Sequence, residues 1–201
     1  MNRRISAAGA AAVTVTVFLF ALGLALRFLF GSYLVCMLLP LGFVLMTAGF
    51  RRESAPERQV AADAGLVFSA VYAALILLVY FSQTTTVRLE ELNGQAARLL
   101  DYRRGGLMFN YDLLGYGMMA LSTFFTGLSF QAGDRADKWL KWLLTAHGAF
   151  FPGCFLLPMT GMFTAMAEGE GSGGGTIALL IWCAYFLPVG ILAWRHFARK
   201  G

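Results

Sequence analysis

Apolar residues gather in six long runs along the chain, separated by short polar connections. A helix rises about 1.5 Å per residue, so about 20 apolar residues cross the roughly 30 Å of bilayer hydrocarbon. Each run is long enough, and we predict an all-α fold, a polytopic six-transmembrane-helix bundle. The predicted spans are about 9–30, 33–50, 64–83, 107–130, 139–165 and 176–195. The connections leave no room for a soluble domain, so residues 1–201 are expected to form a single integral membrane domain.

The connection between the third and fourth runs has a helical pattern of its own. Its apolar positions at helical spacing are Leu89, Leu92, Ala96, Leu99 and Leu100. Thr86 is a candidate N-cap, and Gly105 and Gly106 form the expected stop. We predict an amphipathic outer-surface helix over about 87–104, between spans 3 and 4. This helix either covers the top of the bundle or acts as a lid over a cavity.

Two further patterns concern the shape and packing of the spans. Pro152 and Pro158 both lie in the fifth run, and each removes a backbone donor, so this helix is expected to be kinked. Gly65, Ser69 and Ala73 form a stripe of small residues at four-residue spacing in the third run. Such a stripe allows close approach of two helices, so this face is expected to pack inward.

The composition fits a membrane protein. Hydrophobic residues make up 58% of the chain, and mean hydropathy is +0.65, above the values typical of soluble domains. The net charge of +5 and the pI of about 9.4 are compatible with nucleic-acid binding. The 16 Lys and Arg are distributed among the connections instead of one basic face, so no nucleic-acid partner is expected, and membrane lipids are the expected surroundings.

The basic residues also predict an orientation. Eleven Lys and Arg lie on the side of the two termini, and five lie on the other side. By the positive-inside rule both termini are expected to be cytoplasmic, in a multi-pass protein of the bacterial cytoplasmic (inner) membrane. Arg3 and Arg4 precede the first run as in a secretory signal, but the run is too long for one and is assigned as the first span.

Asp112 is the least expected residue within a span. Helical rise places it about 8 Å below the outer boundary, where an ionised carboxylate costs about 2 to 3 kcal/mol unless it is paired or hydrated. Arg27 approaches the outer end of the first run at a similar depth, and we predict an ion pair between the two, either directly or through water. Such a pair either only fixes the first helix against the fourth or belongs to a functional site.

Other polar or amphipathic side chains can reach the same layer from spans three to six. They are Tyr80, Gln83, Asn110, Tyr116, Thr160, Thr164 and Trp182. Tyr116 follows Asp112 by four residues and therefore shares its face. Together with Arg27 and Asp112 these residues predict an outward-facing pocket that binds a small amphiphilic or lipid-like molecule, in order to transport or to sense it.

No motif assigns a catalytic residue, a metal or a cofactor. His147 and His196 are the two histidines, and their predicted depths differ too much for a shared metal or haem. The three cysteines, Cys36, Cys154 and Cys183, all lie in apolar runs and are expected to behave as small hydrophobes. His147 is expected to be a neutral, hydrogen-bonded interior residue, and otherwise forms a possible second polar site.

Two other functions stay open. An intramembrane enzyme could use Asp112 and His147 as acid and base, although helical rise separates them by about 10 Å. Alternatively, the chain is an accessory subunit without a pocket, whose outer helix docks onto another membrane protein. A homo-oligomer also remains open.

Overall fold

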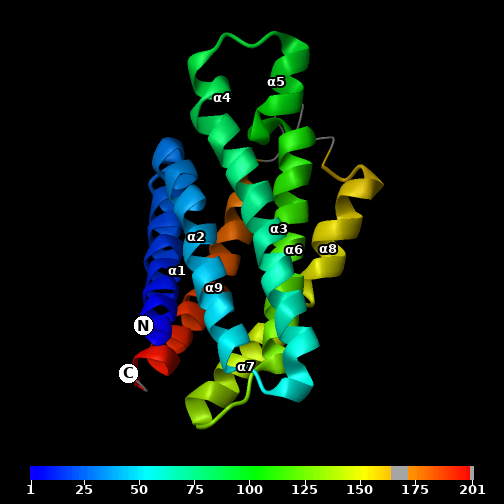
Figure 1. The fold of residues 1–201 in the computed structure, drawn as a ribbon. Coiled ribbons are helices and arrows are strands. Elements are labelled where there is room, and N and C mark those ends of the chain that lie inside the picture. Colours follow the sequence, from blue (N-terminus) through cyan, green and yellow to red (C-terminus); the bar gives the residue numbers. More distant parts are fainter. Residues whose placement is uncertain (164–171, 200–201) are drawn as a thin grey trace.

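The computed structural model describes residues 1–163 and 172–199 of the chain. All regular secondary structure in this part is helical, as the apolar runs predict. Thr164 and the predicted end of the fifth span at 165 lie outside the described residues. The long helices are α1 Asn2–Ala25, α2 Leu29–Glu53, α3 Gln59–Thr84, α6 Leu107–Ser129, α7 Arg135–His147, α8 Phe150–Leu156 and α9 Ser172–Arg199. They form one bundle whose two chain ends lie at the same end, here called the terminal end (Figure 1).

Five helices in the described part are long and apolar enough to cross a membrane. They are Asn2–Ala25, Leu29–Glu53, Pro56–Leu89, Arg135–Thr160 and Ile177–Arg199. Helix α6 has 23 residues but is not among them, because residues such as Asn110 and Asp112 make it more polar. Many of its side chains are buried, from Met108 to Ser129. Most polar groups of α6, such as Asp112, Ser122 and Thr126, are therefore shielded by neighbouring helices, whereas Asn110 is exposed.

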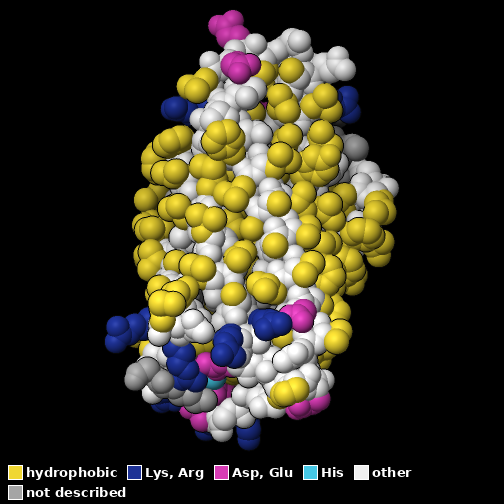
Figure 2. All heavy atoms as spheres, viewed as in Figure 1, with side chains coloured by type: hydrophobic (Ala, Val, Ile, Leu, Met, Phe, Trp, Pro, Cys, Tyr) yellow, Lys and Arg dark blue, Asp and Glu magenta, His cyan; other side chains and the backbone are white. Residues whose placement is uncertain are grey.

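The surface seen in Figure 2 has an apolar belt between two charged ends. Apolar side chains cover the middle of the bundle, and Lys, Arg, Asp and Glu gather at the top and bottom of the view. Exposed apolar groups in this number, such as Val15, Phe18 and Ile181, are expected where lipid is the solvent. The distribution is that of a membrane protein.

Small residues allow the closest helix contacts. A Cβ atom at Gly65 of α3 would lie 2.7 Å from the hydroxyl oxygen of Thr126 on α6. The Ser122 hydroxyl on α6 donates a 2.7 Å hydrogen bond to the carbonyl oxygen of Gly65. Ser69 and Ala73 are buried on the same face of α3. The prediction that this stripe packs inward is confirmed, and its partner is α6.

The fifth predicted span is broken into α7 and α8. Between them, Gly148, Ala149 and Phe151 donate to carbonyl groups three residues earlier instead of four. Pro152 follows and has no backbone donor. The expected kink is confirmed, and α8 lies beside α6 at the edge of the bundle (Figure 1), continued by a 3₁₀ turn, Leu157–Thr160.

The connection between α3 and α6, residues 85–106, is called the α3–α6 segment. The single helix predicted over 87–104 is not confirmed, because the segment forms α4, Thr86–Leu89, α5, Gly94–Leu100, and a 3₁₀ turn, Tyr102–Arg104. The backbone of Glu90 is extended, and the Asn93 side chain caps a new helix by accepting from the Ala96 amide at 2.9 Å. Gly105 ends the turn in the left-handed conformation, at φ 62°. The expected glycine stop is confirmed.

Candidate functional site

Asp112 lies on the second turn of α6 and is only 2% exposed. Its oxygen Oδ1 is buried and has no hydrogen-bond partner. Among the described residues, no Lys, Arg or His forms an ion pair with this carboxyl group. A buried acid of this kind is costly unless something satisfies it.

The expected ion pair between Arg27 and Asp112 does not form. Helix α1 ends at Ala25, short of the predicted 30, and Arg27 is an exposed residue of the following turn. Its φ of 55° is left-handed, and the Phe28 amide donates back to the Gly23 carbonyl at 2.8 Å. This is the closing geometry of a helix end. Arg27 thus leaves the helix before it can face α6.

Five tyrosines, and no paired cation among the described residues, lie in the neighbourhood of Asp112. We call Tyr33, Tyr72, Tyr80, Tyr102 and Tyr116 the tyrosine shell. All five lie within electrostatic range of the Asp112 carboxyl group. The hydroxyl of Tyr80 is within hydrogen-bonding range of that group. The hydroxyl of Tyr72 is buried without a partner, so the shell contains a second unsatisfied polar atom.

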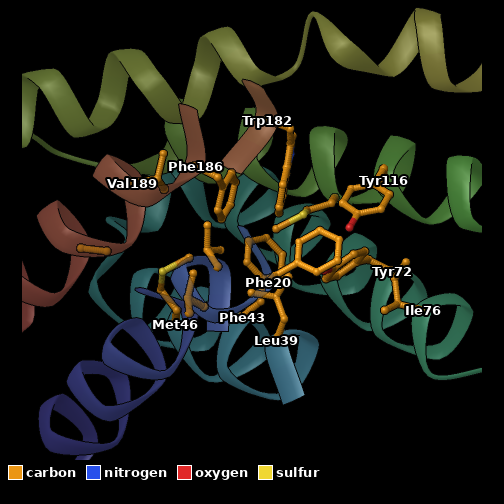
Figure 3. Close-up of a cluster of buried hydrophobic side chains, with 14 of the residues drawn as sticks. Phe20, Leu39, Phe43, Met46, Tyr72, Ile76, Tyr116, Trp182, Phe186 and Val189 are labelled. Carbon is orange, nitrogen blue, oxygen red and sulfur yellow. The ribbon is translucent and has the colours of Figure 1, made fainter. Parts of the chain in front are cut away.

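Three members of the shell pack against one another from different elements. The ring centroids of Tyr33 on α2 and Tyr80 on α3 are 5.5 Å apart. Tyr102, from the α3–α6 segment, lies 6.4 Å from Tyr33 and 6.1 Å from Tyr80. Deeper in the bundle, Tyr72 and Tyr116 have centroids 6.2 Å apart and lie on the same side of the core (Figure 3). The shell therefore joins α2, α3, α6 and the segment.

A cavity of about 220 Å³ borders the shell and the α3–α6 segment. It is called the segment cavity and is lined by Leu29, Phe30, Tyr33, Gln83, Val87, Arg88, Asp101 and Arg103. Gln83 anchors the segment at this point, because its amide nitrogen donates to the Leu100 carbonyl at 2.9 Å. Its amide oxygen accepts from the Tyr102 backbone at 3.0 Å. Gln83 thereby positions Tyr102 within the shell.

The charged groups that line the segment cavity interact with each other or with an aromatic ring. Asp101 accepts from the Arg103 side chain at 3.0 and 2.8 Å and from the Arg103 amide at 3.0 Å. Burial raises the pKa of Asp101, but these hydrogen bonds outweigh burial and hold the pKa below the ordinary value. The Arg88 guanidinium lies 4.8 Å from the centre of the Phe30 ring. None of these groups reaches Asp112 as a counterion.

His147 forms a polar contact deeper in the bundle and is 1% exposed. The Trp182 indole donates to its Nε2 at 3.1 Å, and Nδ1 lies 2.8 Å from the Thr123 hydroxyl. Because an indole only donates, Nε2 accepts, and the proton of a neutral ring is on Nδ1. The Thr123 hydroxyl is free to accept, since it donates to its own helix. The expectation of a hydrogen-bonded interior histidine is confirmed.

The structure brings together part of the predicted site. Tyr80, Gln83, Asp112 and Tyr116 are all buried in one region, and the Trp182 ring packs edge-on against Tyr116 at 5.1 Å (Figure 3). By contrast, Arg27, Asn110 and Thr160 are exposed, so the structure does not bring them to the carboxyl group. Thr160 donates to the Leu157 carbonyl in its own turn.

Three members of the shell were missed at the level of sequence. Tyr72 precedes Tyr80 by eight residues and thus lies on the same face of α3, a signal that could have identified it. Tyr33 sits three residues before the buried Cys36 on α2, a weaker signal of the same kind. Tyr102 belongs to a turn, and only the tertiary structure places it near Asp112.

A second polar cluster, the terminal cluster, lies at the other end of the bundle. His196 of α9 is buried, its Nδ1 lies 3.0 Å from Asp137 of α7, and its Nε2 lies 2.9 Å from Glu53 of α2. Arg3 of α1 forms a 2.8 Å ion pair with Glu53. When Asp137 and Glu53 are both ionised they only accept, so both ring nitrogens must donate, which requires the imidazolium form of His196. The cluster joins four helices.

The chain matches no protein-family model, no curated protein and no solved structure. The arrangement of its own side chains is therefore the basis for a functional proposal.

Proposed function

We propose that the chain is a six-span protein of the bacterial cytoplasmic membrane, with α6 as the sixth span and the terminal end in the cytoplasm. Two observations support this. Helix α6 has the length of a span and is enclosed by its neighbours, which explains how it can be more polar than the other five. The terminal end carries most of the Lys and Arg and the exposed indoles of Trp139, Trp142 and Trp194.

We further propose that this protein binds a small amphiphilic or lipid-like molecule in the outer half of the bundle, to transport or to sense it. The segment cavity admits the molecule, and its polar group is bound at the tyrosine shell. The observation that carries the proposal is the buried Asp112 oxygen without a partner. An unsatisfied buried acceptor costs about 1 to 3 kcal/mol, a cost that a bound donor removes.

Native mass spectrometry of protein purified in a mild detergent tests this proposal. We expect a co-purified molecule on the wild-type protein and a much smaller bound fraction on Asp112→Asn. Glu90→Gln is the matched control, because Glu90 is an exposed acid of the α3–α6 segment. Equal occupancy of wild type and Asp112→Asn, at unchanged thermal stability, would contradict the proposed site.

The accessory-subunit function is the second candidate. It is favoured by exposed apolar side chains at the segment, Leu89 at 68% and Leu99 at 44%. The same native spectra would then show a second protein instead of a small molecule. The enzyme alternative receives no such support, since both ring nitrogens of His147 are occupied by Thr123 and Trp182.

A further inference from the structure

We infer that the polar group bound at Asp112 is a cation, an amine or ammonium head group, so that the ligand of this protein is a cationic amphiphile. This inference rests on the proposed function, and it names the chemical class of the ligand. It is carried by the juxtaposition of a buried, unpaired carboxyl oxygen with the aromatic walls of the tyrosine shell.

The charges around Asp112 favour a cation. The carboxyl group is 2% exposed and forms no ion pair within the described part of the chain. The nearby guanidinium of Arg103 is held by Asp101, and that of Arg88 lies over Phe30. A neutral head group would supply a hydrogen bond but no charge, and an anionic head group would be repelled. A cationic head group supplies both the donor and the counter-charge.

The rings around Asp112 favour the same class. Ring faces attract cations, and sets of aromatic side chains are a known means of binding ammonium groups. Tyr33, Tyr80 and Tyr102 contact one another with centroids 5.5 to 6.4 Å apart, and Tyr72 and Tyr116 follow on the inner side. A small hard metal ion would need several oxygen ligands, whereas an organic cation uses the ring faces and the single carboxyl group together.

Access for the ligand runs through the segment cavity. The cavity borders Tyr33 but not Asp112, so a ring of the shell has to move before a head group reaches the carboxyl group. Tyr102 is the member of the shell that belongs to the α3–α6 segment. Its backbone amide donates to the Gln83 side-chain oxygen, and the Gln83 side-chain nitrogen donates to the nearby Leu100 carbonyl. Leu29 and Phe30 line the same cavity and are exposed at the α2 surface, so the alkyl tail can remain in lipid.

The test uses short probes that share one tail and differ in the head group. Hexylammonium, hexanol and hexanoate are added to the wild type, Asp112→Asn and Glu90→Gln in nanodiscs at constant ionic strength, and the thermal unfolding midpoint is measured. We expect hexylammonium to raise the midpoint of the wild type and of Glu90→Gln. It should bind Asp112→Asn at least tenfold more weakly, and the two other probes should have little effect.

The outcomes separate this inference from the proposed function. One outcome is that hexanol or hexanoate stabilises the wild type to the same extent as the cation, with the effect lost in Asp112→Asn. This result would support a binding site at Asp112 and refute the assignment of a cationic ligand. If no probe stabilises any variant, the proposed function fails as well. Equal stabilisation of wild type and Asp112→Asn by the cation overturns the inference. Should Asp112→Asn not fold, Tyr102→Leu replaces it, with a severalfold loss of affinity for the cation and none for hexanol.

Discussion

At the residue scale, Asp112 is a buried acid that the protein itself does not satisfy. The Tyr80 hydroxyl reaches the carboxyl group, yet Oδ1 has no partner. Pairs of buried charges are commonly retained for packing, but a single unpaired carboxyl group weakens the empty bundle. Its presence is therefore easier to explain by binding than by stability.

Replacing Asp112 with Leu should stabilise the empty protein. The change removes a buried unsatisfied acceptor at an equal number of side-chain heavy atoms, but it also removes the partner of the Tyr80 hydroxyl. We therefore expect a gain of at most about 1 kcal/mol. Thermal unfolding in a mild detergent measures it, with Glu90→Gln as the control for a surface acid. A clear loss of stability would instead show that Asp112 holds the helices together.

Arg27 differs from Asp112 because it is exposed, and its backbone conformation places it at the end of α1. Its φ of 55° is unfavourable for a residue with a Cβ atom, whereas glycine adopts it freely. We therefore expect Arg27→Gly to keep or raise stability, by up to about 1 kcal/mol, and to leave ligand binding unchanged. Circular dichroism on heating and native mass spectrometry provide the two measurements. Loss of ligand binding in Arg27→Gly would instead support the ion pair with Asp112 that the sequence predicts.

At the scale of elements, the α3–α6 segment is held by polar contacts in addition to the packing of Leu100 and Tyr102 against the core. The Asp101 side chain accepts from Arg103, and Gln83 binds the backbone on either side of Asp101. Such contacts are sensitive to pH in a way that the apolar packing of the long helices is not.

Acidification should release this segment first. The pKa of Asp101 lies below the ordinary value of about 3.9, so its contribution to stability is present at neutral pH. It is lost as the pH falls through the lowered pKa. Hydrogen exchange at residues 94–104 should increase below about pH 4, while the long helices stay protected. Asp101→Asn should show this faster exchange already at pH 7. Unchanged exchange in both cases would refute the role of Asp101.

The terminal cluster is a second element contact that depends on charge. His196 lies between carboxylates of two helices and packs against the Phe50 ring, with centroids 5.9 Å apart. His196→Ala leaves Asp137 without its cation and opens a cavity, so we expect a loss of about 2 to 4 kcal/mol. Trp194→Ala, an exposed neighbour, serves as the control in the same thermal measurement. Equal effects of the two changes on thermal unfolding would show that the terminal cluster does not contribute to the stability of the fold.

At the scale of the whole molecule, the even number of proposed spans agrees with the position of both chain ends at one end of the bundle (Figure 1). This arrangement supports the proposal that α6 is a span, although α6 is not among the five helices that are apolar enough by composition. Its neighbours α3, α7 and α8 shield it on several sides, and α3 contacts it most closely.

Thiol labelling of intact cells tests this topology. We expect a membrane-impermeant reagent to modify Glu90→Cys from outside and Glu57→Cys only after lysis, because the two positions lie at opposite ends of α3. The native cysteines lie within the helices, with Cys36 and Cys183 buried, and serve as the background. Labelling of both variants from the same side would contradict the proposed orientation or the number of spans.

The sequence by itself determined where the long apolar helices lie, because their length, apolarity and breaking residues are local properties, whereas it did not predict the division of the α3–α6 segment into short elements. The long helices, the break near Pro152 and the inward face of Gly65 all follow from such patterns. Only the tertiary structure decided which side chains lie near the Asp112 carboxyl group. The neighbours of Asp112 depend on how each helix is rotated about its axis and on where α1 ends. Because α1 ends at Ala25, Arg27 does not face Asp112, whereas Tyr33 and Tyr102 lie near the carboxyl group. Contacts between elements distant in sequence leave no periodic signal, so Tyr33 and Tyr102 could be recognised as neighbours of Asp112 only in the folded bundle.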